Sequence, residues 1–470
     1  MIPPQNYSRE IRRLDAADLS PVWAPDGIGA FAEGWGGLEM VRKFLKSWLS
    51  MLAGTAVLLV SSFSAQAFES IKMGDWDVSF SGNINGFWTS VDCDPNANGA
   101  VAGGLACGSM NTSSRDVGSI RTGLLPSWLG LNAKTTVGNI NTEINIGFQP
   151  GIDGGAQSNE LDGALQNNSE NIRQVNVKFG GDWGTLMIGR DLGVFGSDAI
   201  LADMTLLGVG TVSDLTAGGG NTSLGRIGVG YLYADWKAQV QYSSPNFGGF
   251  SFAVAIVDPW GMGALSSDSM NSSDFSQKSD TYGFEGKAAY SFGGDDSTVS
   301  GKVWAGFINQ SLDSSGTVFA SQDATGAEFG AKVSFSGLDL VGYFYSGDGI
   351  GTTGFLLDGM DLGGNTRDSD GFYAQATYAF PGPGTKVGLS FGESNLDLGF
   401  GDVAVGGSCE VLTAASCTLV QTNESFVAGL YHPLTPALNL VLEYTATEST
   451  AHNGNTAEET VIAIGAILFY

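Results

Sequence analysis

From residue 76 onward, the chain repeats stretches of about ten residues in which apolar and polar side chains alternate, each followed by a turn signal. In WKAQVQY at 236–242, for example, apolar side chains occupy every second position and Lys or Gln fills the positions between them. Successive side chains of a β-strand point to opposite faces, so the pattern predicts strands with one apolar and one polar face. We expect sixteen strands, at 76–90, 128–135, 140–148, 175–179, 186–190, 236–242, 250–256, 282–292, 299–307, 327–335, 338–345, 372–380, 387–391, 426–430, 438–444 and 460–470.

The connections between these strands alternate in length. Short links are expected at 136–139, 180–184, 245–249, 293–297, 336–339, 381–384 and 432–436, and long ones at 91–117, 149–171, 191–226, 258–280, 309–326, 346–370, 394–423 and 446–459. Short turns at one end and long loops at the other are the signature of a transmembrane β-barrel, which must close because unpaired backbone groups are costly in hydrocarbon. We therefore predict an all-β fold, a transmembrane antiparallel barrel. A soluble β-sandwich, the alternative, gives no reason for regular alternation of loop length.

The third long connection differs from the others. It follows the hairpin RQVNVKFGGDWGTLMIGR at 173–190, and it is apolar where the other long loops are built from Ser, Asp, Asn and Gly. Its apolar side chains are Val194, Phe195, Ile200, Leu201, Met204, Leu206, Leu207 and Val209. So much apolar surface is costly in water, so we expect this loop to fold inward into the lumen of the barrel.

Charge excludes one class of partner. The sequence has 48 acidic and 21 basic residues, a net charge of -27, with 43 % hydrophobic residues, 15 % charged residues and 70 glycines. Nucleic-acid binding needs clustered Lys and Arg to contact phosphates, so no nucleic-acid partner is expected.

The N-terminal region has the order of a secretory signal peptide. Basic residues follow Met40, an apolar run covers 51–63, and Ala65-Gln66-Ala67 supplies the small-residue cleavage site. We expect residues 40–67 to be removed and the barrel to comprise residues 68–470. Residues 1–39 stand upstream of a complete signal, which indicates an over-called start or, alternatively, a disordered leader.

The four cysteines suit an exported protein. Cys93 and Cys107 fall in one expected loop, and Cys409 and Cys417 fall in another, so local pairing is the simplest of the three connectivities. Neither pair has the close spacing of zinc ligands, and no metal site is predicted.

Three other features carry little chemistry. The glycines of 349–354 fit a dinucleotide fingerprint but lie in a long loop with no helix pattern after them. His432 lies in a short turn and His452 in a loop, where solvated histidines are expected and not a catalytic triad. The acidic clusters at 268–280 and 295–296 could hold divalent cations, although solvated loops explain them as well. We expect no enzymatic activity and no cofactor.

Several segments resemble those of Gram-negative general porins. The hairpin at 173–190 resembles the stretch before their constriction loop, VQYSSPNFGGFSFAVAI at 240–256 resembles the next hairpin, and SWLGLNAKTTVGNINTEINIGFQPG at 127–151 resembles an early one. The terminal Phe469-Tyr470 resembles the aromatic end that the outer-membrane assembly machinery reads. The resemblance implies a sixteen-stranded, usually trimeric barrel in outer-membrane lipid and lipopolysaccharide, with its third long loop in the lumen.

The resemblance also implies a pore constriction, where loop carboxylates face basic residues of the wall. By position, Arg190 matches a wall arginine, Asp198 and Asp203 are the loop carboxylates, and further basic candidates are Arg173, Lys237, Arg121 and Arg226. Strict alternation would place Arg190 on the lipid face, so we expect a bulge at Gly189 to turn it inward. Ser197 is expected to cap a short helix that displays both carboxylates on one side while Ile200, Leu201 and Met204 anchor it.

These features predict a passive diffusion channel for small hydrophilic solutes and ions. Two carboxylates in a narrow lumen, together with the acidic chain, favour cations. A structural or adhesive barrel with little conductance, and a substrate-specific channel with saturable uptake, are the alternatives.

Overall fold

The computed structural model describes residues 70–95, 101–109, 115–152, 170–212, 222–261, 265–266, 269, 282–293, 297–312, 321–404, 409 and 417–470. The chain divides into two units, Met1–Val57 and Leu58–Tyr470, and every described residue belongs to the second. The expected signal peptide and the acidic residues of the clusters at 268–280 and 295–296 lie outside the described residues.

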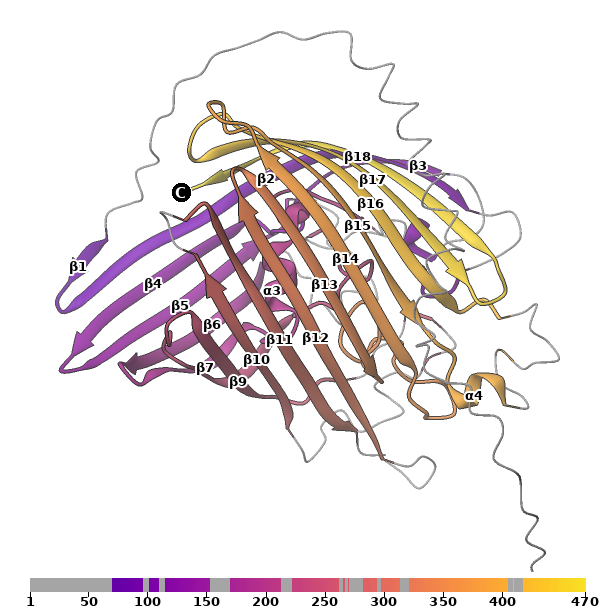
Figure 1. The fold of residues 1–470 in the computed structure, drawn as a ribbon, viewed down its shortest axis with the longest axis horizontal. Coiled ribbons are helices and arrows are strands. Elements are labelled where there is room, and N and C mark those ends of the chain that lie inside the picture. Colours follow the sequence, from indigo (N-terminus) through magenta and orange to yellow (C-terminus); the bar gives the residue numbers. More distant parts are fainter. Residues whose placement is uncertain are drawn as a thin grey trace, which may run out of the picture. The chain divides into compact units, whose positions relative to one another are not determined.

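Within the described residues, eighteen strands form one antiparallel sheet, seen in Figure 1 as long tilted arrows. They are β1 (Ile71–Met73), β2 (Trp76–Pro95), β3 (Arg115–Arg121), β4 (Trp128–Val137), β5 (Ile140–Pro150), β6 (Glu170–Gly181), β7 (Gly184–Leu192), β8 (Trp236–Ser243), β9 (Phe250–Val257), β10 (Gly283–Phe292), β11 (Val299–Leu312), β12 (Gln322–Phe335), β13 (Leu338–Asp348), β14 (Asp368–Ala379), β15 (Lys386–Leu396), β16 (Val420–Pro433), β17 (Leu438–Ala451) and β18 (Thr456–Phe469). The last strand, β18, pairs with β2, and this pairing closes the barrel.

The barrel has sixteen strand positions, because two of the eighteen strands add none. β1 is a three-residue strand that pairs with β2. β3 and β4 pair with the same edge of β2, β3 along Phe87–Cys93 and β4 along Asp77–Asn83, so they share one position. The predicted fold class, a closed sixteen-stranded antiparallel barrel, is confirmed. The sequence pattern had not predicted β1 or β3.

Several strands extend beyond their predicted ends, most of all toward the long loops. β17 continues to Ala451 and β18 begins at Thr456, so the expected long loop at 446–459 is a four-residue turn, and this prediction was wrong. Both faces of the sheet are polar there: Glu448 and Thr450 alternate with Ser449. Period-two alternation ends where a strand leaves the hydrocarbon, but backbone pairing continues.

The two faces of the barrel differ as the pattern predicted. On β12, Phe329 is 57 % exposed on the outer face, whereas its neighbour Glu328 is 4 % exposed on the inner face. The same alternation places aromatic and aliphatic side chains outside along the other strands. In the part of the chain that the structure describes, no helix is both long and apolar enough to cross a bilayer.

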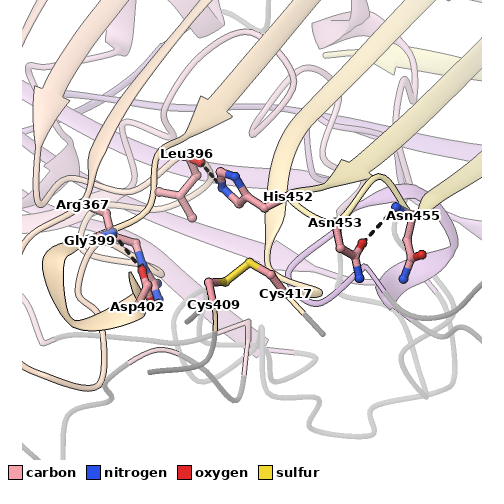
Figure 2. The surroundings of a disulfide bond; sticks show 9 residues. All are labelled: Arg367, Leu396, Gly399, Asp402, Cys409, Cys417, His452, Asn453 and Asn455. Atoms are coloured by element: carbon pink, nitrogen blue, oxygen red, sulfur yellow. Dashed lines mark hydrogen bonds and ion pairs between the residues drawn. A yellow bond between two sulfur atoms is a disulfide. The ribbon is translucent and has the colours of Figure 1, made fainter. Parts of the chain in front are cut away.

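Both disulfides lie at the long-loop end of the barrel. Cys93 is bonded to Cys107 and Cys409 to Cys417. Cys93 belongs to strand β2, so its expected place in a loop was wrong, and the first bridge ties residues 101–109 to the wall. Near the second bridge, the carboxylate of Asp402 accepts two hydrogen bonds from Arg367 at 2.8 Å each (Figure 2).

Candidate functional site: a segment across the lumen

Residues 193–212, called the lumen segment here, follow β7 and lie inside the barrel. Three carboxylates of the wall accept hydrogen bonds from its backbone N–H groups. The bonds run from Val194 and Phe195 to Glu285 (2.6 and 2.9 Å), from Gly196 to Glu328 (2.9 Å), and from Val209 and Gly210 to Glu443 (2.6 and 2.9 Å). These acids belong to β10, β12 and β17, so the segment follows the inner wall across much of the barrel.

The position of these acids follows from strand alternation. Glu285 follows Phe284 and Glu443 follows Leu442, and both preceding apolar side chains are exposed on the outer face. A carboxylate that accepts several backbone N–H groups satisfies donors that water would otherwise have to reach. The wall therefore supplies hydrogen-bond partners for a segment with little regular structure of its own.

The apolar residues of the segment pack as expected, with one exception. Val194, Phe195, Ile200, Met204 and Val209 are buried. Leu201 is 61 % exposed, so its predicted role as an anchor was wrong. Strand β8 begins at Trp236, so the predicted end of the loop at residue 226 was too early.

The segment contains a short helix, α3 (Ser197–Ala202), and a 3-10 turn, η3 (Met204–Leu207). The N-cap of α3 is Gly196 and not Ser197, because the chain enters the helix with a left-handed backbone (φ 75°) that glycine adopts readily. The hydroxyl of Ser197 donates instead to the carbonyl of Val194 at 2.7 Å.

Asp198 turns toward the wall and not toward an open pore. Its carboxylate contacts Lys287 of β10 at 3.0 Å and also Lys302 of β11. Burial raises the pKa of the Asp198 carboxyl, but the two lysine charges outweigh burial and hold the pKa below its ordinary value. One carboxylate shared by two lysines leaves a positive local balance.

Asp203 is buried away from Asp198, so the prediction that one side of the helix displays both was wrong. Its oxygens accept hydrogen bonds from the backbone N–H and hydroxyl of Thr205 (2.9 and 2.7 Å) and from the hydroxyl of Tyr231 (2.9 Å). Burial raises the pKa of Asp203, and the charge of Arg226 opposes this rise. Asp203 and Arg226 thus fix the loop.

The other basic candidates are also buried. Lys237 lies 2.5 Å from Glu285, and Arg121 donates to the carbonyl of Thr222 at 2.8 Å. Arg173 lies at a register shift between β5 and β6, where it is the extra residue and 5 % exposed. A bulge therefore exists, but at Arg173 and not at the expected position.

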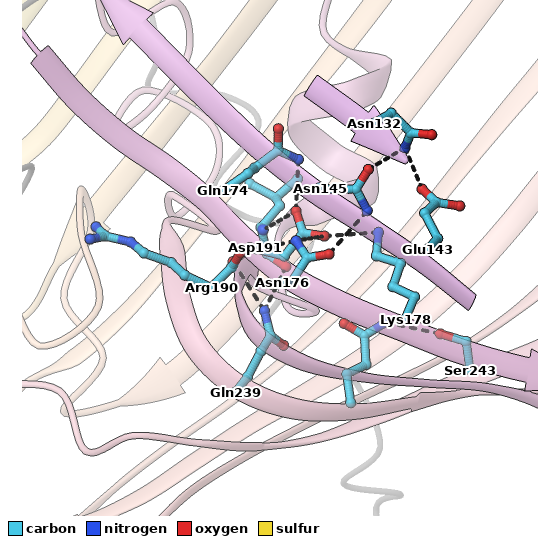
Figure 3. Close-up of polar contacts among 12 residues, drawn as sticks. Asn132, Glu143, Asn145, Gln174, Asn176, Lys178, Arg190, Asp191, Gln239 and Ser243 are labelled. Atoms are coloured by element: carbon cyan, nitrogen blue, oxygen red, sulfur yellow. Dashed lines mark hydrogen bonds and ion pairs between the residues drawn. The ribbon is translucent and has the colours of Figure 1, made fainter. Parts of the chain in front are cut away.

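Arg190 lies on the outer side of β7. The register with both neighbouring strands is continuous through Gly189, so the predicted bulge there was wrong. Arg190 pairs with Val175, which is exposed outside, and Figure 3 shows its side chain pointing away from Asp191, which lies among the polar side chains of the inner face. The pore-facing position expected for Arg190 was therefore wrong.

The inner face of β4–β7, the open wall, carries a row of asparagines. Asn132, Asn145 and Asn176 lie directly opposite one another on β4, β5 and β6, and their side-chain amides hydrogen-bond in series (Figure 3). The row ends at Asp191, which accepts from Asn176 at 3.2 Å and from Lys178 at 3.0 Å. Side chains here satisfy one another within the sheet.

Sequence reasoning missed the wall residues that hold the segment: Glu285, Glu328, Glu443, Lys287 and Lys302. The sequence did contain a signal for them, because each of these charged residues occupies a position on the polar face of a strand with alternating apolar and polar residues. Charges at such positions inside a narrow barrel must find partners, and the inward loop is the nearest source of backbone donors.

A family profile described as Gram-negative porin matches residues 54–453. Among solved structures, the outer-membrane channel DcaP of Acinetobacter baumannii is similar, with a TM-score of 0.57, 16 % identity, and coverage of 86 % of this chain and 100 % of that chain. An anion-selective porin from Comamonas acidovorans is also similar, with a TM-score of 0.54, 14 % identity, and coverage of 84 % and 100 %. No curated protein matches the sequence significantly.

Proposed function

Because the chain belongs to the Gram-negative porins, we propose that it lets small hydrophilic solutes and ions diffuse passively across the outer membrane. The observation that carries this proposal is the lumen segment, bonded to the inner wall at Glu285, Glu328 and Glu443. A segment that lies across a polar lumen makes the lumen narrower but does not close it with an apolar core. A size-selective channel requires this arrangement.

Reconstitution in planar bilayers tests the proposal. A diffusion channel gives stepwise conductance, and liposome swelling falls smoothly as the size of the sugar increases. A protein that folds but gives no current steps would instead be a structural or adhesive barrel. Saturable uptake of one solute would indicate a substrate-specific channel.

The cation preference expected from the sequence loses its support at this site. It required two carboxylates facing the pore, yet Asp198 is paired with two lysines and Asp203 is buried. We propose that the charges exposed on the inner wall, and not the net charge of the chain, set the ion preference.

We also propose that residues 40–67 are a signal peptide and that the mature protein begins at Phe68, from the order of basic, apolar and small residues. Mass spectrometry of outer-membrane fractions should find no peptides from residues 1–60. Such peptides in the mature protein would contradict this proposal.

We propose a homotrimer in the outer membrane, inserted by the assembly machinery through its C-terminal strand and surrounded by lipid and lipopolysaccharide. Support comes from the family and from the aromatic residues at the end of β18. Chemical cross-linking in detergent should yield a three-chain species that heating dissociates, and a single-chain species alone would contradict it.

A further inference from the structure

The inner wall between α3 and the short turns carries more positive than negative charge. Lys302 on β11 and Lys332 on β12 stand directly opposite each other and point inward. Like charges in direct cross-strand opposition destabilise a sheet, and the contacts of Lys302 with Asp198 and of Lys332 with Asp339 offset this repulsion only in part, since Asp198 is shared with Lys287. Side chains of both remain accessible, at 36 % and 41 %.

A third lysine belongs to the same group. Lys386 begins β15 and lies over the ring of Tyr431, 5.3 Å from its centroid. It is close enough to Lys332 and Asp339 to interact with both charges. Asp339 itself lies 3.6 Å from Lys332, which is a loose contact.

The carboxylates available on this wall do not balance the lysines. Between α3 and the short turns, Asp198 contacts Lys287 and Lys302, Asp339 contacts Lys332, and Lys386 lies over the ring of Tyr431. The other inward acids are already engaged: Glu285 pairs with Lys237, and Glu328 and Glu443 accept backbone N–H groups. Four lysines thus share two carboxylates, and this part of the inner wall is basic in an otherwise acidic chain.

Building on the proposed function, we propose that Lys302, Lys332 and Lys386 form a binding site for small polyvalent anions that bear carboxylate or phosphate groups. The ammonium groups of Lys302 and Lys332, on the adjacent strands β11 and β12, and that of Lys386 on β15, two strands beyond β13, present point charges and several N–H donors toward the lumen. This arrangement suits a solute with more than one anionic group. The site lies between the constriction and the short turns, so anions from that side reach it first.

Single-channel recording with citrate as the probe tests this proposal. Citrate added at the short-turn side should block the wild-type current in a saturable way. The variant K302Q/K332Q/K386Q should need about tenfold more citrate, because three attractive charges are removed. The charge-conserving K302R/K332R/K386R should retain the block, and so should Arg190→Gln, which removes a positive charge from the outer side of the wall.

Equal block of the wild type and the Gln variant would overturn the anion site, while open-channel current in both would leave the channel proposal standing. Absence of any current in the wild type would overturn the channel proposal instead. If the triple Gln variant loses its heat-modifiable gel shift, Lys332→Gln and Lys386→Gln are tested singly, and unchanged block in both overturns the site.

Discussion

The open wall and the wall behind the lumen segment use polar side chains in different ways. On the open wall, Lys134 pairs with Glu143 at 3.3 Å and Lys178 with Asp191 at 3.0 Å, so charges are matched within the sheet. On the covered wall, β10–β17, Glu285, Glu328 and Glu443 bind the backbone of the lumen segment, so these carboxylates are not free to balance the lysines of that wall. A loop that binds wall carboxylates thus changes the charge of the wall that faces the lumen, although the residues of the wall stay the same.

The largest effect is expected at the point where the covered wall holds the segment. Glu443→Ala removes the acceptor for two backbone N–H groups and for the hydroxyl of Tyr431, which lies 2.6 Å away. Buried donors left unpaired cost about 1–3 kcal/mol each, so the loss should reach about 3 kcal/mol or more. The temperature of the heat-modifiable gel shift should fall.

Glu448→Ala provides the matched control, since Glu448 lies on the same strand but its side chain is on the outer face of the sheet. Equal changes in unfolding temperature for the two variants would show that the bonds to the segment contribute nothing.

The disulfides lie outside the lumen segment, so a smaller effect on the barrel and its conductance is expected from their removal. Replacing all four cysteines with Ser removes loop closures worth up to about 3 kcal/mol each on the chain-entropy model. Because Cys107 joins a loop to the end of β2 and does not link two wall strands, the barrel should still fold and conduct. Loss of the gel shift would show instead that the bridges hold the barrel.

The two loop aspartates should differ in their effect on ion preference. Asp198→Asn leaves Lys287 and Lys302 without their counter-charge and should raise the anion-to-cation permeability ratio about threefold at low salt. Asp203→Asn changes a buried side chain and should leave the ratio unchanged. Reversal potentials in a salt gradient measure the permeability ratio of both variants. Equal shifts of the reversal potential in Asp198→Asn and Asp203→Asn would place Asp203 in the pore.

The smallest effect is expected on the open wall. Asn145→Ala removes two hydrogen bonds between uncharged side-chain amides, to the half-buried Asn132 and the buried Asn176, so the cost should be about 1–2 kcal/mol. Conductance should match the wild type. A large drop in unfolding temperature would mean that the row supports the barrel as strongly as Glu443 does.

The sequence predicted the barrel because each strand must present an apolar face to lipid, and that requirement repeats along the chain. It did not predict β3 or the polar extensions of β17 and β18, because strands beyond the hydrocarbon need no apolar face. The burial of Phe195 and Met204 was expected because apolar side chains on a loop in water are costly.

The orientation of single charges was harder to predict. Arg190 and Asp203 were placed by position in a resembling family, whereas their direction depends on register and on partners far along the chain. The bulge at Arg173 and the contact of Asp198 with Lys302 depend on such long-range packing. The alternation of residues within one strand gives no information about it.

The central claim is that the lumen segment sets the width of the channel. Deleting residues 197–207, which removes α3 and η3, and joining Gly196 to Gly208 through a short glycine linker tests it by single-channel conductance. The variant, once its gel shift shows a folded barrel, should conduct more than the wild type. Equal conductance of the two folded proteins would contradict it.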